Sequence, residues 1–254
     1  MSLILDSICV WHGARAAVHG VSVSAPPGRI VAVIGRNGSG KSSLVRAIAG
    51  VHVGRSSGSA TWQGRELAAS TAAERARRVA YVAQRPLVAA NFTAREVIEL
   101  AGAVVPRSAE HIERAVDALA VHELLDRSFA ALSGGEQQRV VLARALAQHD
   151  AGGLLILDEP LSAMDLAEQQ RVAGALQAVA SAGSLVLVVL HDLALADALA
   201  HSVWWMEAGR LRASGLREAV LSETALLEGF GVPFERVGDS LRPIVALRGA
   251  AAEG

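Results

Sequence analysis

Lysine is almost absent from this sequence. The 24 basic residues include a single lysine, Lys41, and the other 23 are arginines. Arginine replaces lysine tolerably at a solvated surface, but not where a compact charge on a thin stem must fit a tight pocket. Survival of one lysine by chance is the simpler explanation, and it weakens once the neighbours of Lys41 are considered. The scarcity therefore directs attention to residue 41 as a candidate functional position.

Other scarcities limit the class of protein. Cys9 is the only cysteine, so no internal disulfide can form, and a reducing cytoplasm suits the chain. No apolar run reaches the roughly 18 residues of a membrane span, because the best candidate, 185–190, ends at His191. The first residues hold neither a basic leader nor a long apolar run, so no signal peptide is expected. The net charge of −1 lacks the basic excess of nucleic-acid binders, so no nucleic-acid partner is expected.

Apolar sequence is plentiful enough for a large core. Hydrophobic residues make up 52% of the 254 positions, which supports a core without disulfides or metals. Short β-branched runs at 30–34, 154–157 and 185–190 are typical of buried strands in a parallel sheet. Further strands are predicted at 18–23, 58–62, 79–82, 203–206 and 210–213, and helices at 41–49, 93–100, 108–119, 133–148, 165–179 and 193–199, followed by a short helix and a loose strand. Alternating strands and helices favour an α/β fold, and the strandless segment of about 90–149 favours an inserted helical lobe.

The segment before the helix predicted at 41–49 matches a phosphate-binding pattern. Residues 35–42, GRNGSGKS, fit G-x-x-x-x-G-K-[ST] between a buried strand and a helix. Glycines let successive backbone N–H groups turn towards phosphate oxygens, and the helix start adds its positive dipole end. Lys41 would reach the β- and γ-phosphates, and Ser42 would offer its hydroxyl to Mg²⁺. A glycine turn without a ligand is the alternative, which the context and the lone lysine disfavour.

A glycine pair opens the helix predicted at 133–148. Residues 132–139 are LSGGEQQR, in which Ser133 and Glu136 have the spacing of a capping box. A capped helix explains those two residues but not Gly134 and Gly135, which cost helix stability in the first turn. Exposed N–H groups at a helix start admit an anion. A second phosphate-binding surface is therefore the preferred interpretation.

The run LSGGEQQR resembles the signature sequence of ABC ATPases, and the resemblance covers essentially the whole chain. It implies a P-loop NTPase fold with a RecA-like mixed sheet core, an N-terminal antiparallel β region and an inserted helical lobe. The expected organisation is a single domain, 1–254. Within it, 1–89 and 150–254 would form the core and about 90–149 the lobe.

The resemblance also assigns roles beyond the two glycine segments. The run LLILDEP resembles the Walker B strand, where Asp158 would hold Mg²⁺ and Glu159 would polarise the attacking water. His191 resembles the switch histidine that contacts the γ-phosphate, and Gln84 resembles the Q-loop glutamine that links Mg²⁺ to the lobe. The predicted catalytic residues are Glu159 and His191, and the predicted Mg²⁺ ligands are Ser42, Gln84 and Asp158.

An aromatic residue near the N-terminus is expected to stack on adenine. Trp11 and His12 both stand at a suitable distance before the P-loop. Trp11 is preferred for its larger π-face, and His12 remains the alternative stacking residue. Residues 162–165 resemble the D-loop, which brings Asp165 to the nucleotide. The full set predicted to bind ATP is Trp11, Gly35, Arg36, Asn37, Gly38, Ser39, Gly40, Lys41, Ser42, Ser43, Gln84, Ser133, Gly134, Gly135, Glu136 and Asp165.

One P-loop and one signature in the chain imply partners. In this family each ATP lies between the P-loop of one subunit and the signature of another, so a second copy or a similar ATPase subunit is expected. Transport would need separate transmembrane permease subunits, with this chain peripheral on the cytoplasmic face of the cell membrane. The tail, including FGV at 230–232, resembles the importer subfamily for iron–siderophore, haem and cobalamin, which implies an external substrate-binding protein. An exporter ATPase subunit or a soluble ABC ATPase, such as an iron–sulfur assembly factor, is the alternative, while LSGGE disfavours a P-loop kinase or motor.

Overall fold

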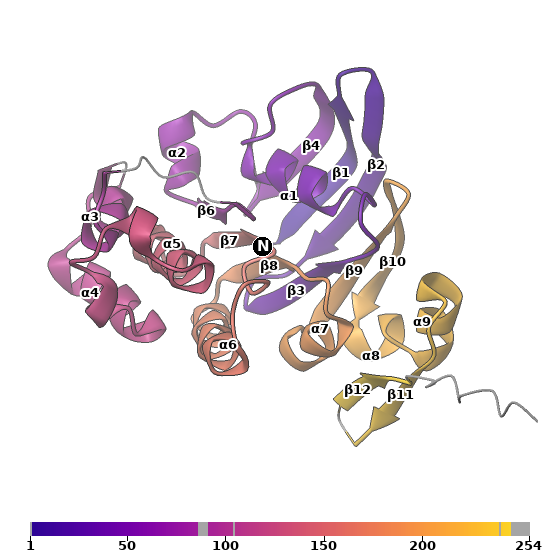
Figure 1. The fold of residues 1–254 in the computed structure, drawn as a ribbon. Helices are drawn as coiled ribbons and strands as arrows, with labels where there is room; N and C mark the ends of the chain where they lie inside the picture. The colour runs from indigo at the N-terminus through magenta and orange to yellow at the C-terminus, as the bar shows by residue number, and fades with distance from the viewer. Residues whose placement is uncertain (1, 86–90, 104, 239, 245–254) are drawn as a thin grey trace, which may run out of the picture.

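A mixed six-stranded sheet forms the centre of the fold (Figure 1). The computed structural model describes residues 2–85, 91–103, 105–238 and 240–244. The sheet has the order β10-β9-β3-β8-β7-β6, in which β10 joins β9 antiparallel and every other neighbouring pair is parallel. Its strands are β3 (Arg29–Ile34), β6 (Val79–Val82), β7 (Leu154–Asp158), β8 (Leu185–Val189), β9 (Ser202–Glu207) and β10 (Arg210–Leu216). The three runs predicted as buried parallel strands are β3, β7 and β8, at the middle of this sheet.

A second, antiparallel sheet contains the N-terminal strands. Its order is β2-β1-β4-β5, with β1 (Leu3–His12), β2 (Arg15–Ala25), β4 (Ser56–Trp62) and β5 (Arg65–Glu66). Strand β1 was not predicted, because Ser7 has φ 52° and the pairing register shifts between Leu5 and Ile8, which interrupts the alternation of apolar residues. The α/β class with a mixed central sheet and an antiparallel N-terminal region is confirmed.

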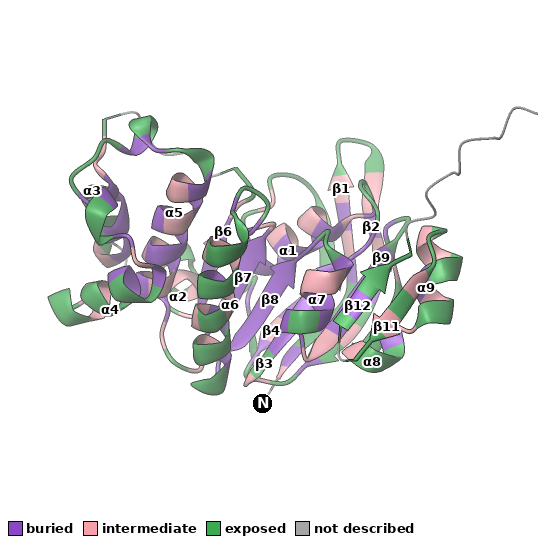
Figure 2. Ribbon diagram, turned by 60° about the horizontal axis from the view of Figure 1, so that its bottom comes forward, coloured by how far each residue is buried: buried purple, intermediate pink, exposed green. Residues whose placement is uncertain are grey.

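Both faces of the middle strands of the six-stranded sheet are buried, as the purple central strands in Figure 2 indicate. On β3, Val31 and Val33 pack in one apolar cluster with Leu44 of helix α1 and with the antiparallel sheet. Ile30 and Ala32 point to the other face, where the cluster includes helices α5, α6 and α7. Burial on two faces explains why the strand sequences are continuously apolar.

Helices surround the central sheet and gather beyond one edge of it. They are α1 (Lys41–Ala49), α2 (Ala72–Ala76), α3 (Ala94–Glu99), α4 (Ala109–Leu119), α5 (Gly134–Gln148), α6 (Leu166–Ser181), α7 (Leu193–Leu199), α8 (Arg217–Val220) and α9 (Glu223–Phe230), with 3₁₀ turns at Leu100–Ala103, His122–Leu124 and Phe129–Ala131. Helices α3, α4 and α5 pack together beyond β6 (Figure 1). The division into a core and a lobe of about 90–149 within one domain stays a prediction. The expected loose strand in the tail is a hairpin of β11 (Phe234–Val237) and β12 (Ser240–Pro243).

Candidate active site

The glycine loop between β3 and α1 has a shape that requires glycine. Gly35 has φ 142°, and a Cβ there would lie 2.1 Å from the Met206 carbonyl oxygen. Gly40 has φ 99°, and a Cβ there would lie 2.5 Å from the Ala17 carbonyl oxygen. Gly40 also precedes α1 as its N-cap without any side-chain cap. The first N–H groups of α1 are therefore left for an anion.

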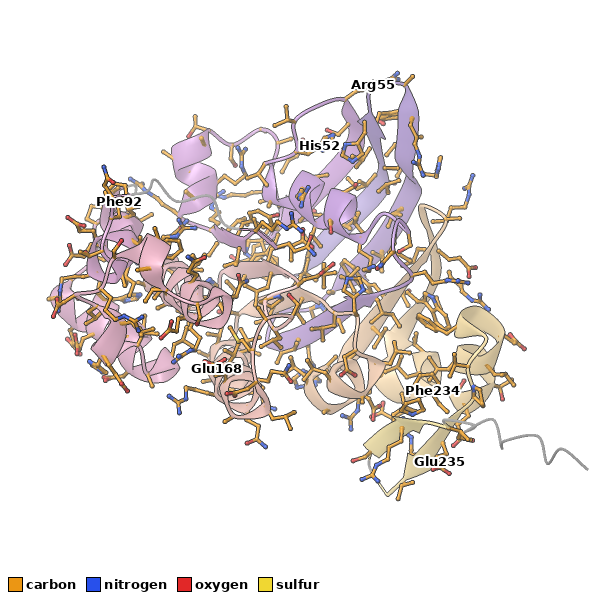
Figure 3. All side chains as sticks on the ribbon, in the orientation of Figure 1. His52, Arg55, Phe92, Glu168, Phe234 and Glu235 are labelled. Carbon is orange, nitrogen blue, oxygen red and sulfur yellow. The ribbon has the colours of Figure 1, made fainter. Side chains whose placement is uncertain are left out.

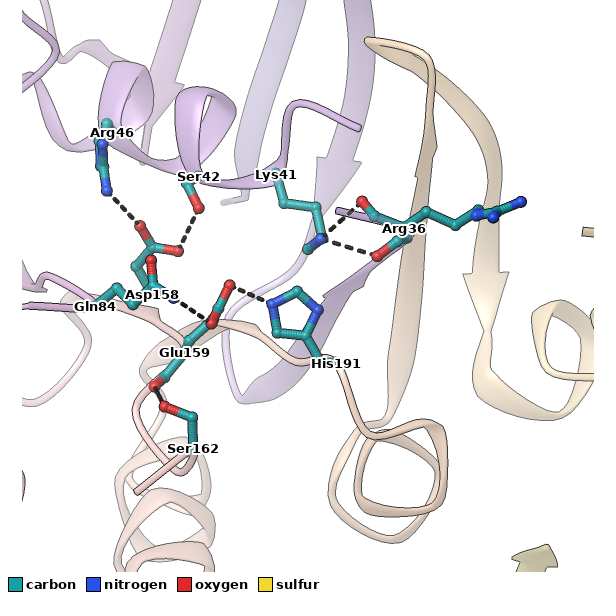
Figure 4. Close-up of polar contacts among 10 residues, drawn as sticks. Arg36, Lys41, Ser42, Arg46, Gln84, Asp158, Glu159, Ser162 and His191 are labelled. Atoms are coloured by element: carbon teal, nitrogen blue, oxygen red, sulfur yellow. Dashed lines mark hydrogen bonds and ion pairs between the residues drawn. The ribbon is translucent and has the colours of Figure 1, made fainter. Parts of the chain in front are cut away.

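Lys41 is a buried cation at the start of α1. Its side chain donates from Nζ to the carbonyl oxygens of Gly35 at 2.8 Å and Arg36 at 3.2 Å (Figure 4). The residue is only 4% exposed. Burial lowers the pKa of Lys41, and the carboxylates of Glu159 and Asp158 oppose that shift. Negative charge brought close to a desolvated ammonium stabilises it, so the position of Lys41 is suited to an anionic ligand.

Asp158, at the end of β7, is fixed by two side chains of α1. Ser42 donates from Oγ to Oδ1 of Asp158 at 2.8 Å, and Arg46 Nη2 lies 3.3 Å from Oδ2 (Figure 4). Burial raises the pKa of Asp158, while the Ser42 hydrogen bond and the Arg46 charge act in the opposite direction. Arg46 was not among the site residues predicted from the sequence. Its signal was the four-residue spacing from Ser42, which puts both side chains on one helix face.

Glu159 is held by side chains from the ends of the two neighbouring strands. Gln84, after β6, donates from Nε2 to Oε2 at 2.6 Å, and His191, after β8, contacts Oε1 through Nε2 (Figure 4). Ser162 donates to the Glu159 carbonyl oxygen at 3.2 Å. Glu159 has φ 54°, which is rare for a residue with a side chain and concentrates at functional sites. The structure thus brings together three residues that are far apart in the sequence.

A cavity of about 1060 Å³ joins these residues. The predicted site residues that line it are Asn37, Gly38, Ser39, Gly40, Lys41, Ser42, Ser43, Gln84, Glu159 and His191. Arg15, His19 and Gly209 also line it and were not predicted. Arg36 instead lines a smaller neighbouring hollow of about 210 Å³ together with Asn37. The volume and the polar wall suit a ligand of nucleotide size.

Trp11 and His12 lie on different sides of β1, as successive strand residues do. His12 lines the cavity, and its Nε2 lies 2.8 Å from Oγ of Ser43. Its ring meets that of His52 edge-on, with centroids 5.1 Å apart. Trp11 is instead covered by the guanidinium of Arg55, which lies 4.3 Å from its ring centre. The geometry therefore favours His12 over the preferred Trp11 as the aromatic residue beside a bound base.

The signature segment stands apart from the cavity of its own chain. Within the described ranges, Ser133, Gly134, Gly135 and Glu136 do not line that cavity. Ser133 is the N-cap of α5, and its capping box with Glu136 is complete. A Cβ on Gly135 would lie 2.9 Å from the Ala163 carbonyl oxygen, whereas Gly134 has no contact closer than 3.9 Å. Close packing thus accounts for Gly135, and Gly134 remains the residue that internal packing does not explain.

Asp165 is also outside the cavity of this chain as far as the structure describes it. Its side chain caps α6 by accepting from the Glu168 backbone N–H at 2.8 Å. Glu168, labelled in Figure 3, also pairs with Arg139 of the signature helix at 2.9 Å. The D-loop and the signature segment therefore form one connected surface.

The side chains predicted to bind Mg²⁺ offer a fitting donor set. Ser42 and Asp158 are already in contact, and Gln84 lies on the same cavity wall. Hydroxyl, carboxylate and amide oxygens are the hard ligands that Mg²⁺ prefers. The residues present therefore fit a magnesium ion between α1 and the end of β7.

Comparison with known proteins identifies the family. The family model described as ABC transporter matches residues 18–162. The hemin import ATP-binding protein HmuV of Pseudomonas putida is 38% identical over 237 residues, covering 91% of this chain and 92% of that protein. HmuV of Rhodococcus jostii is 39% identical over 244 residues, covering 92% and 82%. A solved structure described as an inward-facing, putative metal-chelate type ABC transporter has a TM-score of 0.77, 23% identity and coverage of 96% and 98%. Among the described residues, no helix has the length and apolar character to cross a membrane.

Proposed function

The chain belongs to the ABC transporter family, and we propose that it is the ATP-hydrolysing subunit of an importer for haem or a related metal chelate. The observation that carries the ATPase part is the Glu159 carboxylate, held by Gln84 and His191 at the wall of the glycine-loop cavity. The importer part rests on relatives at 38% and 39% identity that are named hemin import proteins. Iron–siderophore and cobalamin remain within the proposed substrate class.

ATP binding in this proposal uses the loop and the start of α1. N–H groups of the loop and of the first helix turn donate hydrogen bonds to the phosphate oxygens, and Lys41 supplies a positive charge beside them. The lysine has little exposed surface left to desolvate, because it is 4% exposed. His12 provides an aromatic surface for the base at the other end of the cavity. Mg²⁺, held by Ser42, Gln84 and Asp158, would neutralise negative charge on the β- and γ-phosphates.

Hydrolysis is assigned to the strand ends. The Glu159 carboxylate accepts a hydrogen bond from the attacking water and takes its proton as the water oxygen bonds to the γ-phosphorus. The bond from that phosphorus to the β–γ bridging oxygen breaks in the same step, and ADP leaves. His191 contacts the carboxylate oxygen that Gln84 does not, and in this proposal it lies next to the place that the γ-phosphate takes. Both carboxylate oxygens are therefore oriented before the water arrives, which lowers the entropic cost of reaction.

A second subunit completes the site in this proposal. Ser133 to Glu136 lie outside the cavity of their own chain, so another copy, or a similar ATPase subunit, would have to present them to the nucleotide. Gly134 supports this role because its surroundings leave room for an anion. ATP then joins the two subunits, and hydrolysis lets them separate.

The transport step is assigned to partners. The chain would sit peripherally at the cytoplasmic face of the cell membrane, bound to permease subunits, with an external binding protein supplying the substrate. Purification of the tagged chain from gently solubilised native membranes tests this directly. Recovery of a many-spanning permease and a binding protein that takes up haem, cobalamin or a ferric siderophore supports the importer. Recovery of soluble partners alone contradicts it and favours a soluble ABC ATPase, while a permease that moves substrate outwards favours an exporter.

A further inference from the structure

The C-terminal hairpin holds helix α7 through a buried ion pair. Arg236 of β11 donates from Nη1 and Nη2 to the two carboxylate oxygens of Asp197 in α7, each at 3.0 Å. The Asp197 side chain is 1% exposed. Two parallel hydrogen bonds between a guanidinium and a carboxylate fix both distance and angle. A hairpin more than thirty residues away in sequence therefore sets the position of one side chain in α7.

Further contacts hold α7 in the same place. Arg217, in the first turn of α8, donates from Nη1 to the Asp197 carbonyl oxygen. Leu241 of β12 is buried in the apolar cluster that contains Leu193 and Ala196 of α7. Figure 1 shows α7 between the six-stranded sheet and the hairpin. The helix is thus fixed on its sheet side by apolar packing and on its outer side by the tail.

Helix α7 begins immediately after the histidine that contacts Glu159. Its N-cap is Asp192, which accepts hydrogen bonds from the N–H groups of Ala194 at 2.8 Å and Leu195 at 3.1 Å. His191 is therefore joined directly to the capped end of the helix. Asp197 stands four positions after Leu193, the first residue of α7, which is about 6 Å along the helix axis at 1.5 Å per residue. Because a single short helix connects the two positions, a shift of α7 moves His191.

We propose that the C-terminal hairpin is a positioning element for ATP hydrolysis, acting through the Arg236–Asp197 pair and α7 on His191. The inference rests on the proposed ATPase activity and adds a part of the chain that does not line the nucleotide cavity. A bidentate ion pair suits this role better than an apolar contact, since apolar packing tolerates sliding and paired hydrogen bonds do not. The phosphate contacts assigned to the loop and α1 lie outside α7 and the hairpin, so ATP affinity should depend little on the Arg236–Asp197 pair.

The test separates binding from hydrolysis in the full-length chain. Arg236→Ala should lower kcat about tenfold to a hundredfold while KM and the Kd for a fluorescent ATP analogue stay within about twofold, because a small misplacement of a catalytic group costs rate without costing affinity. Arg236→Lys keeps the charge but not the fork, so it should restore part of kcat. Asp197→Asn keeps the side-chain shape and should likewise lower kcat while KM and Kd stay unchanged. This variant provides the test if Arg236→Ala does not fold.

A matched control comes from a second ion pair that does not contact α7. Arg107 is also largely buried and pairs with Asp150, so Arg107→Ala removes a comparable interaction. It should lower Tm and leave kcat unchanged. Histidine side-chain NMR supplies a readout independent of turnover, since the His191 resonance, assigned by its loss in His191→Ala, should move in the Arg236 and Asp197 variants only.

The outcomes are distinct. A folded Arg236→Ala or Asp197→Asn with wild-type kcat and an unmoved His191 resonance overturns the inference, as does a kcat loss no larger than that of Arg107→Ala. If the wild-type chain itself does not hydrolyse ATP, the proposed function fails, while the resonance still reports whether the hairpin positions His191.

Discussion

Replacement of Lys41 by methionine should separate nucleotide binding from stability. Methionine keeps the length and apolar stem of the side chain and removes its charge. In the wild type the ammonium contacts the carbonyl oxygens of Gly35 and Arg36 and is 4% exposed. Burial lowers the pKa of Lys41, which means that the fold disfavours the charged form. The charge therefore costs stability and is retained for another purpose.

The expected effects of Lys41→Met on ATP binding and on the stability of the fold differ in size. A hydrogen bond to a charged group contributes about 1.5–3 kcal/mol, so loss of two contacts to phosphate oxygens removes at least about 3 kcal/mol of ATP binding. At 1.4 kcal/mol per factor of ten, Kd should rise by about a hundredfold or more. For the fold, relief of the buried charge opposes the loss of two carbonyl contacts, so the free energy of unfolding should change less than the free energy of ATP binding.

Calorimetric titration with Mg-ATP and urea unfolding of the same preparation measure both quantities. Lys41→Arg is the charge control: its forked guanidinium does not fit the space of a thin ammonium, so it should also bind weakly. An unchanged Kd for Lys41→Met would refute the assignment of the glycine loop. A large loss of stability with the methionine would refute the argument that the ammonium is retained for the ligand.

Three further predictions concern other parts of the chain. Glu159→Gln keeps the side-chain size and one acceptor oxygen but cannot take a proton from water, so with Mg-ATP it should accumulate as a dimer in light scattering, and a persistent monomer at saturating ATP contradicts the placement of ATP between two subunits. Burial lowers the pKa of His149 from 6.5 to about 4, so its contribution to stability is complete above pH 6.5 and is lost as pH falls towards 4, by up to about 3 kcal/mol. Urea midpoints at pH 7.5 and 5 measure this, and His149→Asn should show a weaker pH dependence. In Gly229→Ala the new Cβ would lie 2.0 Å from Cζ2 of Trp205, so the indole must move, Tm should fall with a loss of about 1–3 kcal/mol, and indole fluorescence should shift.

The fold could be predicted where the side-chain pattern was regular. Strands β3, β7 and β8 are buried on both faces and therefore carry unbroken apolar runs. Strand β1 was missed because the positive φ of Ser7 and its register shift break the alternation. Helix α2 has no buried residue and so no apolar stripe, although its capping box of Thr71 and Glu74 was present in the sequence.

The site could be predicted where chemistry lies within one contiguous motif. Lys41 and Glu159 each follow a recognisable strand, and motif spacing identifies them. The choice between Trp11 and His12 depends on which face of a bulged strand each side chain occupies, and spacing in the sequence does not give that. The packing of Gly135 against Ala163 depends on a tertiary contact between α5 and the D-loop. Anion binding at a helix start and close packing both favour glycine, so the sequence alone does not distinguish these two explanations for Gly134 and Gly135. The structure does distinguish them, because a Cβ would be too close to Ala163 at Gly135 but not at Gly134.

The order of the strands explains how one carboxylate can respond to distant parts of the molecule. Strand β7 lies between β6 and β8, so Glu159 at its end receives Gln84 from one neighbour and His191 from the other. The chain after Gln84 leads to α3, α4 and α5, and the chain after His191 leads to α7 and the hairpin that holds it. A displacement of either segment withdraws a hydrogen bond from a different oxygen of the same carboxylate. Hydrolysis should therefore require both segments in place, so Gln84→Ala and Arg236→Ala should lower kcat by factors that do not multiply when the changes are combined, because they act on one group.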